Sequence, residues 1–537
     1  MQLELSGQTI SIEALNFIPT NGGGIATGKT ISINLPSSPI RYLYSGWQSW
    51  SLTTWVDTSR PVLPMRPSSM NPLHTDPVYA RETRPHGSWY GMVELAGGQK
   101  LFLGALGLES HVMLNEKDFT GWYEPGSAEN LTNEWFVAVG DEDNIFSRYC
   151  EMLGENLGRP IHKDPHKVWC SWYSLYTEIH ENQLQKILRD LGDLSFDVFQ
   201  VDDGWQVGIG DWEPNAKFPS GMDDLASRIK KSGRLAGLWL APLVVVPSSS
   251  LYKNHRDWLL KDEKGVLVSA GMNWGERLFT LDTTHPAVLD WLSGLMKKVL
   301  SWGYEYIKLD FLYAGALPGK RKVDIPRESA YRNGLKIIRE TLGDAYFLTC
   351  GAPILPSIGL CDAMRIGPDV AGYWSAHRDD DLLMNFAIPG ARNALRTSLH
   401  RLWLGPLVHT DPDVSYFRSR QNDLTPEQKS FLQDIAQICH FKATSDVPSW
   451  LTDSERFALA EYLINDLPVK KTGPQSFRVG ERHVDFGPQI ILPPVPGNSI
   501  KFLGSLLGTL ANVPALMNLF DNLGKGALKK ALKKNPV

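Results

Sequence analysis

Acidic residues stand at the ends of three short apolar segments in the middle of the chain. They are Asp202 and Asp203 in Val201-Asp-Asp-Gly204, Asp310 in Tyr306-Ile-Lys-Leu-Asp310 and Asp369 in Arg365-Ile-Gly-Pro-Asp369. A single Asp in such a place most often caps the next helix or holds a turn. Three strand ends that carry acids are harder to explain in that way, and they predict one shared site at a barrel mouth.

Basic residues accompany two of these acids. Lys308 precedes Asp310 by two positions, and Arg365 precedes Asp369 by four. Residues two apart on a strand point to the same side, so Lys308 is expected to keep the Asp310 carboxylate ionised and to offer donors to a polyol. Two carboxylates on different strands suit glycoside hydrolysis, in which one attacks the anomeric carbon and the other protonates the leaving oxygen.

Tryptophan is abundant, with 18 residues in the chain. Sugar rings stack on the flat faces of indoles, so this count agrees with a carbohydrate ligand, although β-rich cores also bury many tryptophans.

The elements that must position these acids lie in residues 166–440, where short apolar strands alternate with amphipathic helices. The expected strands are residues 167–172, 197–201, 235–241, 304–309, 345–349, 363–366 and 406–409. The expected helices are residues 181–191, 223–231, 286–300, 327–342 and 392–402. Such repeated units over about 250 residues predict a central (β/α)8 TIM barrel, with one strand not visible in the sequence.

The regions on either side of the barrel have a different texture. Residues 1–158 hold short alternating runs between clusters of Gly, Pro, Asn and Ser, which predict an N-terminal β-sandwich. Residues 441–498 are β-leaning and predict a small C-terminal β domain. The expected fold class is therefore multidomain.

The last segment, residues 499–537, is an amphipathic tail rich in lysine. Lys529, Lys530, Lys533 and Lys534 would share one helical face. We expect this tail to be solvated or packed on the protein, with peripheral contact to an anionic membrane surface or a partner as the alternative.

Composition excludes several other classes of protein. The formal net charge of −5 offers no concentrated basic face, so no nucleic-acid partner is expected. Five cysteines without a CxxC pair predict neither a disulfide framework nor a zinc site. No signal-peptide core and no run of 18 apolar residues is found, so the expected location is the cytoplasm.

No metal or cofactor is expected either. His409 with Asp411 and Asp413 is the best metal candidate, but no second His lies at ligand spacing, and polar residues at a barrel mouth explain these side chains better. The chain also lacks a phosphate-binding Gly loop. His285, beside a helix start, is expected to have a capping role.

Seven segments in this order resemble glycoside hydrolase family 36, the α-galactosidases in the clan shared with raffinose synthases. They are Gly46-Trp-Gln-Ser-Trp-Ser51, Val168-Trp-Cys-Ser-Trp-Tyr173, Val201-Asp-Asp-Gly-Trp-Gln206, Gly237-Leu-Trp-Leu-Ala-Pro242, Leu281-Asp-Thr-Thr-His-Pro286, Lys308-Leu-Asp-Phe311 and Arg365-Ile-Gly-Pro-Asp369. Each segment is weak alone, and together they are specific to the clan.

The resemblance implies a role for each matching residue. Asp310 would be the nucleophile and Asp369 the acid/base. The remaining residues would bind the sugar: Asp202 and Asp203 its outer hydroxyls, Lys308 and Arg365 its ring hydroxyls, and Trp172 and Trp239 its faces. Cys350 matches a family site cysteine loosely, with a buried thiol as the alternative. From the N-terminal domain, Trp47 or Trp50 would reach the barrel mouth or lie in the core.

The expected activity is exo-acting hydrolysis of terminal α-linked galactose by double displacement with retention, on an oligosaccharide or glycoconjugate. Residues 312–319 and the segment from Cys350 to Arg365 depart from common bacterial members, which leaves the sugar and its leaving group open. The alternatives are an α-N-acetylgalactosaminidase, a raffinose-synthase-like α-galactosyltransferase, and a non-catalytic carbohydrate-binding protein with a membrane-associated tail. The oligomeric state is not predicted.

Overall fold

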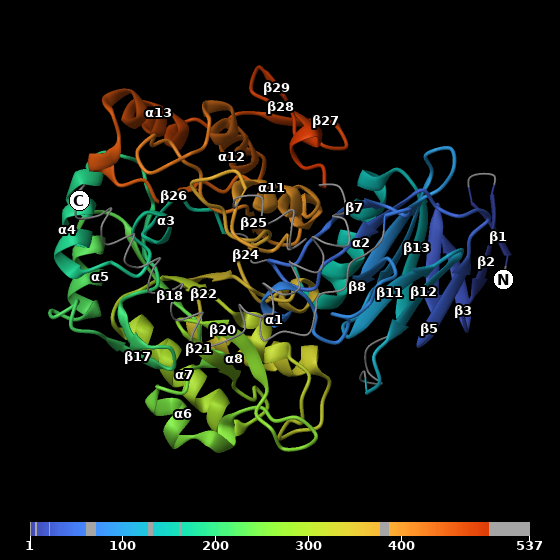
Figure 1. Cartoon of the computed structure of the whole chain (residues 1–537), viewed down its shortest axis with the longest axis horizontal. Coiled ribbons are helices and arrows are strands. Elements are labelled where there is room, and N and C mark those ends of the chain that lie inside the picture. The colour runs from blue at the N-terminus through green and yellow to red at the C-terminus, as the bar shows by residue number, and fades with distance from the viewer. Residues whose placement is uncertain are drawn as a thin grey trace, which may run out of the picture.

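The computed structural model describes residues 2–5, 8–20, 22–60, 71–126, 133–159, 163–375 and 386–492. The lysine-rich tail predicted at 499–537 lies outside the described residues. Figure 1 shows a β-rich unit at the N-terminal end of the chain beside a larger unit of strands and helices.

The N-terminal unit consists of two antiparallel sheets. One has the spatial order β1 (Gln2–Leu5), β2 (Gln8–Glu13), β5 (Thr30–Asn34), β12 (Asp118–Tyr123), β11 (Ser110–Asn115) and β8 (His86–Ser88). The other has the order β3 (Asn16–Thr20), β4 (Gly23–Thr27), β13 (Glu134–Gly140), β10 (Lys100–Ala105), β9 (Tyr90–Glu94), β6 (Arg41–Tyr44) and β7 (Thr54–Asp57).

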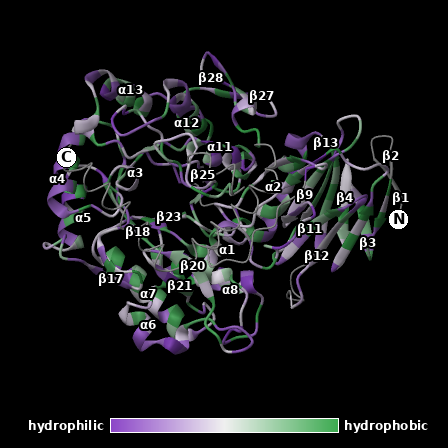
Figure 2. Ribbon diagram, in the orientation of Figure 1, coloured by the Kyte–Doolittle hydropathy of each residue, from purple (hydrophilic) through white to green (hydrophobic). Residues whose placement is uncertain are grey.

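Alternating side chains hold these two sheets together. Ile31 and Ile33 of β5 share one hydrophobic cluster with Leu101, Leu103 and Val137 of the other sheet. Because alternate residues of a strand face opposite sides, Ser32 faces away from this cluster, and Phe102 faces a second cluster that includes residues of the following helix. Figure 2 shows hydrophobic and hydrophilic residues interleaved along these strands. The predicted β-sandwich is confirmed.

Eight parallel strands form the central sheet, with helices outside it (Figure 1). Their spatial order is β25 (His409–Asp411), β24 (Ala363–Arg365), β23 (Tyr346–Thr349), β22 (Tyr306–Leu309), β18 (Leu235–Leu240), β15 (Val198–Val201), β14 (Val168–Cys170) and β26 (Ala443–Thr444). The main helices around them are α4 (Glu181–Leu191), α5 (Met222–Lys231), α7 (Pro286–Ser301), α8 (Arg327–Leu342), α11 (Ala391–Leu399), α12 (Pro426–Ile438) and α13 (Asp453–Ile464).

This sheet confirms the predicted TIM-type barrel and supplies the strand that was not visible in the sequence. That strand, β26, is only two residues long, too short to show any periodicity. It pairs with β14 through Val168↔Ala443 and Trp169↔Thr444, so the barrel sheet extends past residue 440, where its end was predicted. The small C-terminal sheet follows as β27 (Val469–Gly473), β28 (Ser476–Val479) and β29 (Arg482–Asp485).

Local signals explain where several helices begin. The His285 ring accepts a hydrogen bond from the backbone N–H of Ala287 at 3.2 Å, which confirms the expected capping role. Helix α12 begins with a capping box between Thr425 and Gln428, and α13 begins with one between Thr452 and Glu455.

One connection carries further elements toward the barrel mouth. After β18, a small antiparallel sheet forms from β19 (Val244–Val245), β20 (Ser269–Asn273) and β21 (Glu276–Thr280). The long helix α2 (Glu142–Leu157) follows the sandwich and leads toward the barrel.

No helix within the described ranges is long and apolar enough to cross a membrane.

Candidate active site

A cavity of about 190 Å³ opens at the carboxyl ends of the barrel strands. Seven of the nine predicted site residues line it: Trp172, Asp202, Asp203, Trp239, Lys308, Asp310 and Asp369. The other two, Arg365 and Cys350, are buried close to these residues. The parallel topology explains the gathering, because every strand of such a barrel ends at the same mouth.

Asp310 follows the last residue of β22, and both of its carboxylate oxygens accept a hydrogen bond. Oδ2 accepts from the indole Nε1–H of Trp239 at 3.0 Å, and Oδ1 accepts from the backbone N–H of Phe311 at 2.8 Å. Phe311 adopts a left-handed backbone with φ +55°, which turns the chain sharply behind the acid. The carboxylate is therefore held in one orientation at the cavity wall.

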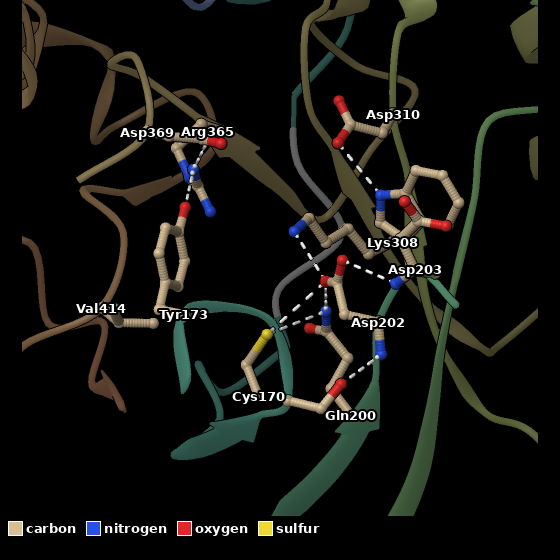
Figure 3. Close-up of polar contacts among 12 residues, drawn as sticks. Cys170, Tyr173, Gln200, Asp202, Asp203, Lys308, Asp310, Arg365, Asp369 and Val414 are labelled. Carbon is tan, nitrogen blue, oxygen red and sulfur yellow. Dashed lines mark hydrogen bonds and ion pairs between the residues drawn. The ribbon is translucent and has the colours of Figure 1, made fainter. Parts of the chain in front are cut away.

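Lys308 contacts a different acid from the one expected. Its Nζ forms an ion pair with Oδ2 of Asp202 at 2.9 Å, and Figure 3 shows this contact between β22 and the end of β15. Gln200 donates to the same oxygen at 2.7 Å. Burial opposes the charge of Lys308, but the Asp202 carboxylate outweighs it, so the pKa of Lys308 lies well above its usual value.

Asp203 is held by two donors. Gln206 Nε2 donates to its Oδ1 at 2.6 Å, and the indole of Trp274 donates to its Oδ2 at 2.7 Å. Burial raises the pKa of Asp203 to about 6, although both donors favour the ionised form.

Asp369 lies beside Arg365 in a network of buried charges. The Arg365 guanidinium contacts Asp369 at 3.1 Å, Asp411 at 3.1 Å and Asp413 at 2.9 Å. The Tyr173 hydroxyl lies between Arg365 and Asp413 and contacts both. Burial raises the pKa of Asp369; Arg365 opposes this shift and the nearby Asp310 carboxylate adds to it.

Asp411 and Asp413, the acids of the rejected metal candidate, therefore orient Arg365. Asp413 has a left-handed backbone with φ +84°, and its Oδ2 also accepts the backbone N–H of Val370 at 2.9 Å. Burial raises the pKa of Asp413 to about 7. Among the described residues, no group of three or more His, Cys, Asp and Glu side chains could hold a metal ion.

Aromatic rings form much of the cavity wall, and sequence analysis assigned no role to two of them, Trp274 and Phe311. Trp274 lies in the two-residue turn Trp274-Gly275 between β20 and β21, and both turn residues have positive φ. Its ring lies 6.2 Å from Trp239 and 4.9 Å from Phe311. An Asn-x-Gly turn between two alternating runs was the available signal, but only the folded hairpin shows where the indole points.

Trp50 brings the N-terminal domain into the site. Its ring lines the cavity and packs edge-on to Phe311 at 5.2 Å. A Cβ on Gly351, which has φ +52°, would approach Trp50 Cη2 to 2.9 Å, so glycine is required there. Trp47 is instead fully buried, and its indole donates to Glu328 at 3.1 Å. Trp50 thus has the expected place at the barrel mouth, and Trp47 has the expected place in the core.

The loop that carries Trp50 is anchored on the barrel by one buried arginine. The Arg401 guanidinium donates to the backbone oxygens of Gly46, Gln48, Ser49 and Ser51 at 2.5–3.1 Å. Burial lowers the pKa of Arg401 to about 10. These four hydrogen bonds from one rigid guanidinium position the loop, and all four acceptors are uncharged backbone carbonyls.

Cys350 is buried at the end of β23, where burial and the Asp310 charge raise the pKa of its thiol well above the usual value. A thiol in this state is a neutral, weakly polar packing group. Cys350 therefore lies near the acids without lining the cavity.

One solved structure resembles nearly the whole chain. TtGalA, an α-galactosidase from Thermus thermophilus in complex with p-nitrophenyl α-D-galactopyranoside, is 42% identical, with a TM-score of 0.86 over 91% of this chain and 99% of that one. The chain belongs to the melibiase family of α-galactosidases. The predicted resemblance to glycoside hydrolase family 36 is thereby confirmed. A second TtGalA structure, in complex with stachyose, gives a TM-score of 0.81 at the same identity, over 86% of this chain and 99% of that one.

Other comparisons agree with this melibiase assignment. The family model described as Melibiase matches residues 140–344. The family 36 α-galactosidase AgaA from Geobacillus stearothermophilus shares the fold, with a TM-score of 0.55 and 16% identity over 82% of this chain and 65% of that one. In sequence, AgaA is 28% identical over 245 residues, which are 42% of this chain and 32% of the relative. The match thus spans about a third of the length of this curated relative.

Proposed function

We propose that this melibiase-family protein removes terminal α-linked galactose from oligosaccharides or glycoconjugates, with retention of configuration. The observation that carries the proposal is the pair Asp310 and Asp369 on the wall of one narrow cavity. Its support is the likeness to TtGalA, whose solved complexes hold p-nitrophenyl α-D-galactopyranoside and stachyose.

Asp310 suits the attacking role because no cation among the described residues forms an ion pair with it. Its hydrogen-bond donors are the N–H groups of Trp239 and Phe311, which fix the plane of the carboxylate. Such donors orient a nucleophile at little cost in its charge. Attack on the anomeric carbon would form a covalent glycosyl-enzyme and release the leaving group.

Asp369 suits the acid/base role because its pKa is raised by burial and by the Asp310 carboxylate. It can therefore hold a proton for the leaving oxygen in the free enzyme. Once Asp310 is esterified, its negative charge is lost and the ion pair with Arg365 prevails. The pKa of Asp369 then falls, which suits removal of a proton from the attacking water.

The remaining side chains can bind the sugar. Asp202 and Asp203 offer carboxylate acceptors, and Lys308 offers a buried donor. The indole Nε1–H of Trp50 is buried and has no hydrogen-bond partner within the part of the chain that the structure describes. The Trp50 ring lines the cavity and offers an aromatic surface to the sugar.

The decisive test is the variant Asp310→Ala, assayed on p-nitrophenyl α-galactoside with and without sodium azide. We expect turnover to be abolished, and any activity rescued by azide should yield the β-galactosyl azide, with inverted configuration. The control is Asp257→Ala, whose side chain is 72% exposed outside the cavity. Near-normal activity of Asp310→Ala would refute the assignment.

The sugar and the acceptor need a separate comparison. We expect p-nitrophenyl α-galactoside to be cleaved with a higher kcat/KM than the N-acetylgalactosaminyl analogue. With galactinol and sucrose together, we expect free galactose as the main product. Preferential cleavage of the N-acetyl substrate would favour the second activity, and accumulation of raffinose would favour transfer.

A further inference from the structure

A second cavity, of about 650 Å³, lies on the outer face of the N-terminal sheet that contains β2, β5, β12 and β11 (Figure 1). It shares no lining residue with the barrel cavity. Phe119 and Tyr123 of β12 point into the sandwich core. The residues between them, Thr120 and Trp122, therefore point to the opposite, outer face.

The strand register aligns a row of side chains across this face. Glu13 pairs with Ser32, Ser32 with Thr120, and Thr120 with Met113. Neighbouring strands lie about 4.8 Å apart, so the row is roughly 14 Å long. The Glu13 carboxylate and the Ser32 and Thr120 hydroxyls thus follow one another at regular steps, and Met113 ends the row.

Two aromatic rings form one end of the cavity. Trp122 pairs across the strands with His111, and Tyr79 stacks on that His111 with ring centres 3.5 Å apart and an interplanar angle of 12°. Tyr79 meets Trp122 edge-on at 6.1 Å. The underlying His111 is fully buried, but Trp122 and Tyr79 are only half-buried, so ring area remains in contact with the cavity.

The charges around the cavity disfavour anionic ligands. Three carboxylates line it, from Glu13, Glu82 and Asp118. The one lining cation, Arg84, is bound by Glu82 through contacts of 2.9 and 2.7 Å. An excess of acceptors beside aromatic rings suits a neutral ligand with many hydroxyl donors, and it repels phosphates, nucleic acids and acidic proteins.

We propose that this face is a second carbohydrate-binding site, which takes a neutral oligosaccharide or polysaccharide chain. A sugar ring would stack on Trp122 and Tyr79, and its neighbours would donate hydroxyl hydrogen bonds to Thr120 and Ser32 of the row and to Asp118, two residues from Thr120 along β12. The site needs no chemistry from the barrel. It would hold a long carbohydrate on the protein while the narrow barrel cavity takes only chain ends.

The test is native electrophoresis of the full chain through gels that contain galactomannan, with Asp310→Asn as the common background to limit debranching. We expect Trp122→Ala to weaken the retardation constant roughly threefold to tenfold, the range for loss of one aromatic contact. Trp55→Ala is the matched control, a half-buried tryptophan on the other sheet, and it should migrate like its parent. A gel without polysaccharide supplies the reference mobility.

A second variant, Thr120→Arg, tests the site without removing an aromatic ring. Its long side chain would cover the row from a half-buried position, so a loss of binding could not be attributed to a missing ring in the fold. In the active background, both variants should keep the melting temperature and the kcat/KM on p-nitrophenyl α-galactoside. Unchanged retardation of both variants would overturn the proposal. So would equal loss in Trp55→Ala, or no retardation of the parent.

Size-exclusion chromatography at several concentrations separates the competing occupant, a second copy of this chain. A dimer that Trp122→Ala or Thr120→Arg converts to a monomer would overturn the carbohydrate proposal. Failure of the barrel chemistry would appear differently: Asp310→Ala would stay active, while the retardation would still depend on Trp122.

Discussion

Two clusters of four acids lie in this protein, and they manage their charge in different ways. The first lines the barrel cavity and comprises Asp202, Asp203, Asp310 and Asp369. The second lies where the sandwich meets helix α8 and comprises Asp76, Glu109, Glu124 and Glu328. The first cluster has two buried cations, Lys308 and Arg365, of which Arg365 also pairs with Asp411 and Asp413, whereas the second contacts one, Arg327.

The second cluster fastens the sandwich to the start of α8. Arg327 binds both oxygens of Asp76, at 3.0 and 2.6 Å, and both oxygens of Glu124, at 3.0 and 2.6 Å. Glu328 accepts from the indoles of Trp47 at 3.1 Å and Trp89 at 3.0 Å. These contacts join the loop of Trp50 to the barrel, so the cavity wall depends on them.

Protons compensate for the missing cations in the second cluster, because three of its four acids have raised pKa values. Burial raises the pKa of Glu328 to about 8, and it also raises the pKa values of Glu109 and Asp76. In the barrel cavity the pKa values of Asp203 and Asp369 are raised as well, but Lys308 pairs with Asp202 and Arg365 with Asp369 beside the space for a ligand. The comparison teaches that acids at the joint should govern stability, whereas acids in the cavity should govern turnover.

The largest expected effect is on turnover in the cavity. Asp369→Ala should lower kcat/KM on raffinose by about 10³-fold, because proton donation to a poor leaving group is lost. The loss on p-nitrophenyl α-galactoside should be much smaller, since that leaving group needs little protonation. Thermal unfolding should change little, because the buried Arg365 keeps its ion pairs with Asp411 and Asp413. Equal losses on both substrates would contradict the assigned role.

At the joint, Arg327→Met should lower the free energy of unfolding by about 3–5 kcal/mol, because it leaves several acids buried without their cation. Urea unfolding measures this change. The matched control, Arg228→Met, removes an exposed arginine paired with Asp224 and should leave the midpoint unchanged. A stable Arg327→Met protein would show that the joint does not hold the two units together.

A pair of Trp→Phe changes compares the two tryptophans of one loop. Trp50→Phe should lower kcat/KM by about tenfold, because part of an aromatic cavity wall is lost, with a smaller loss of stability than at Trp47. Trp47→Phe should do the reverse: it removes a donor to Glu328 and should cost about 1–3 kcal/mol of stability. The kcat/KM and the free energy of unfolding are measured for both variants. Similar changes in both quantities would contradict the different roles of the two tryptophans.

The smallest expected effect is a change in pH dependence from Glu109→Gln. Glu109 Oε1 accepts from the Ser329 backbone and hydroxyl, whereas its buried Oε2 has no partner among the described residues, so an amide N–H₂ fits there. Because the folded pKa of Glu109 is raised, its stabilisation is full below its ordinary pKa and is lost as pH rises through the folded value.

The variant should therefore gain stability relative to the parent as pH rises from about 5 to 9. Melting temperatures across this range measure the gain. Glu328→Gln is the contrasting variant, because both oxygens of Glu328 already accept N–H groups and an amide would lose one bond. A constant difference between Glu109→Gln and the parent would refute proton uptake at the joint.

The sequence by itself determined the architecture and most of the cavity acids. Strand ends of a parallel barrel must meet at one mouth, so Asp202, Asp310 and Asp369 could be placed together from their positions alone. The alternation of side chains likewise predicted the sandwich. The two-residue strand β26 could not be predicted, because it is too short to show an alternating pattern.

Only the tertiary structure decided which loops complete the site and which charged side chains form ion pairs. Trp274 and Trp50 reach the cavity from a hairpin tip and from another domain, and no local spacing records that approach. Lys308 pairs with Asp202 because β22 and β15 flank β18, although Asp310 is nearer in sequence. Contacts between distant segments depend on how whole elements pack, and packing is a property of the folded chain.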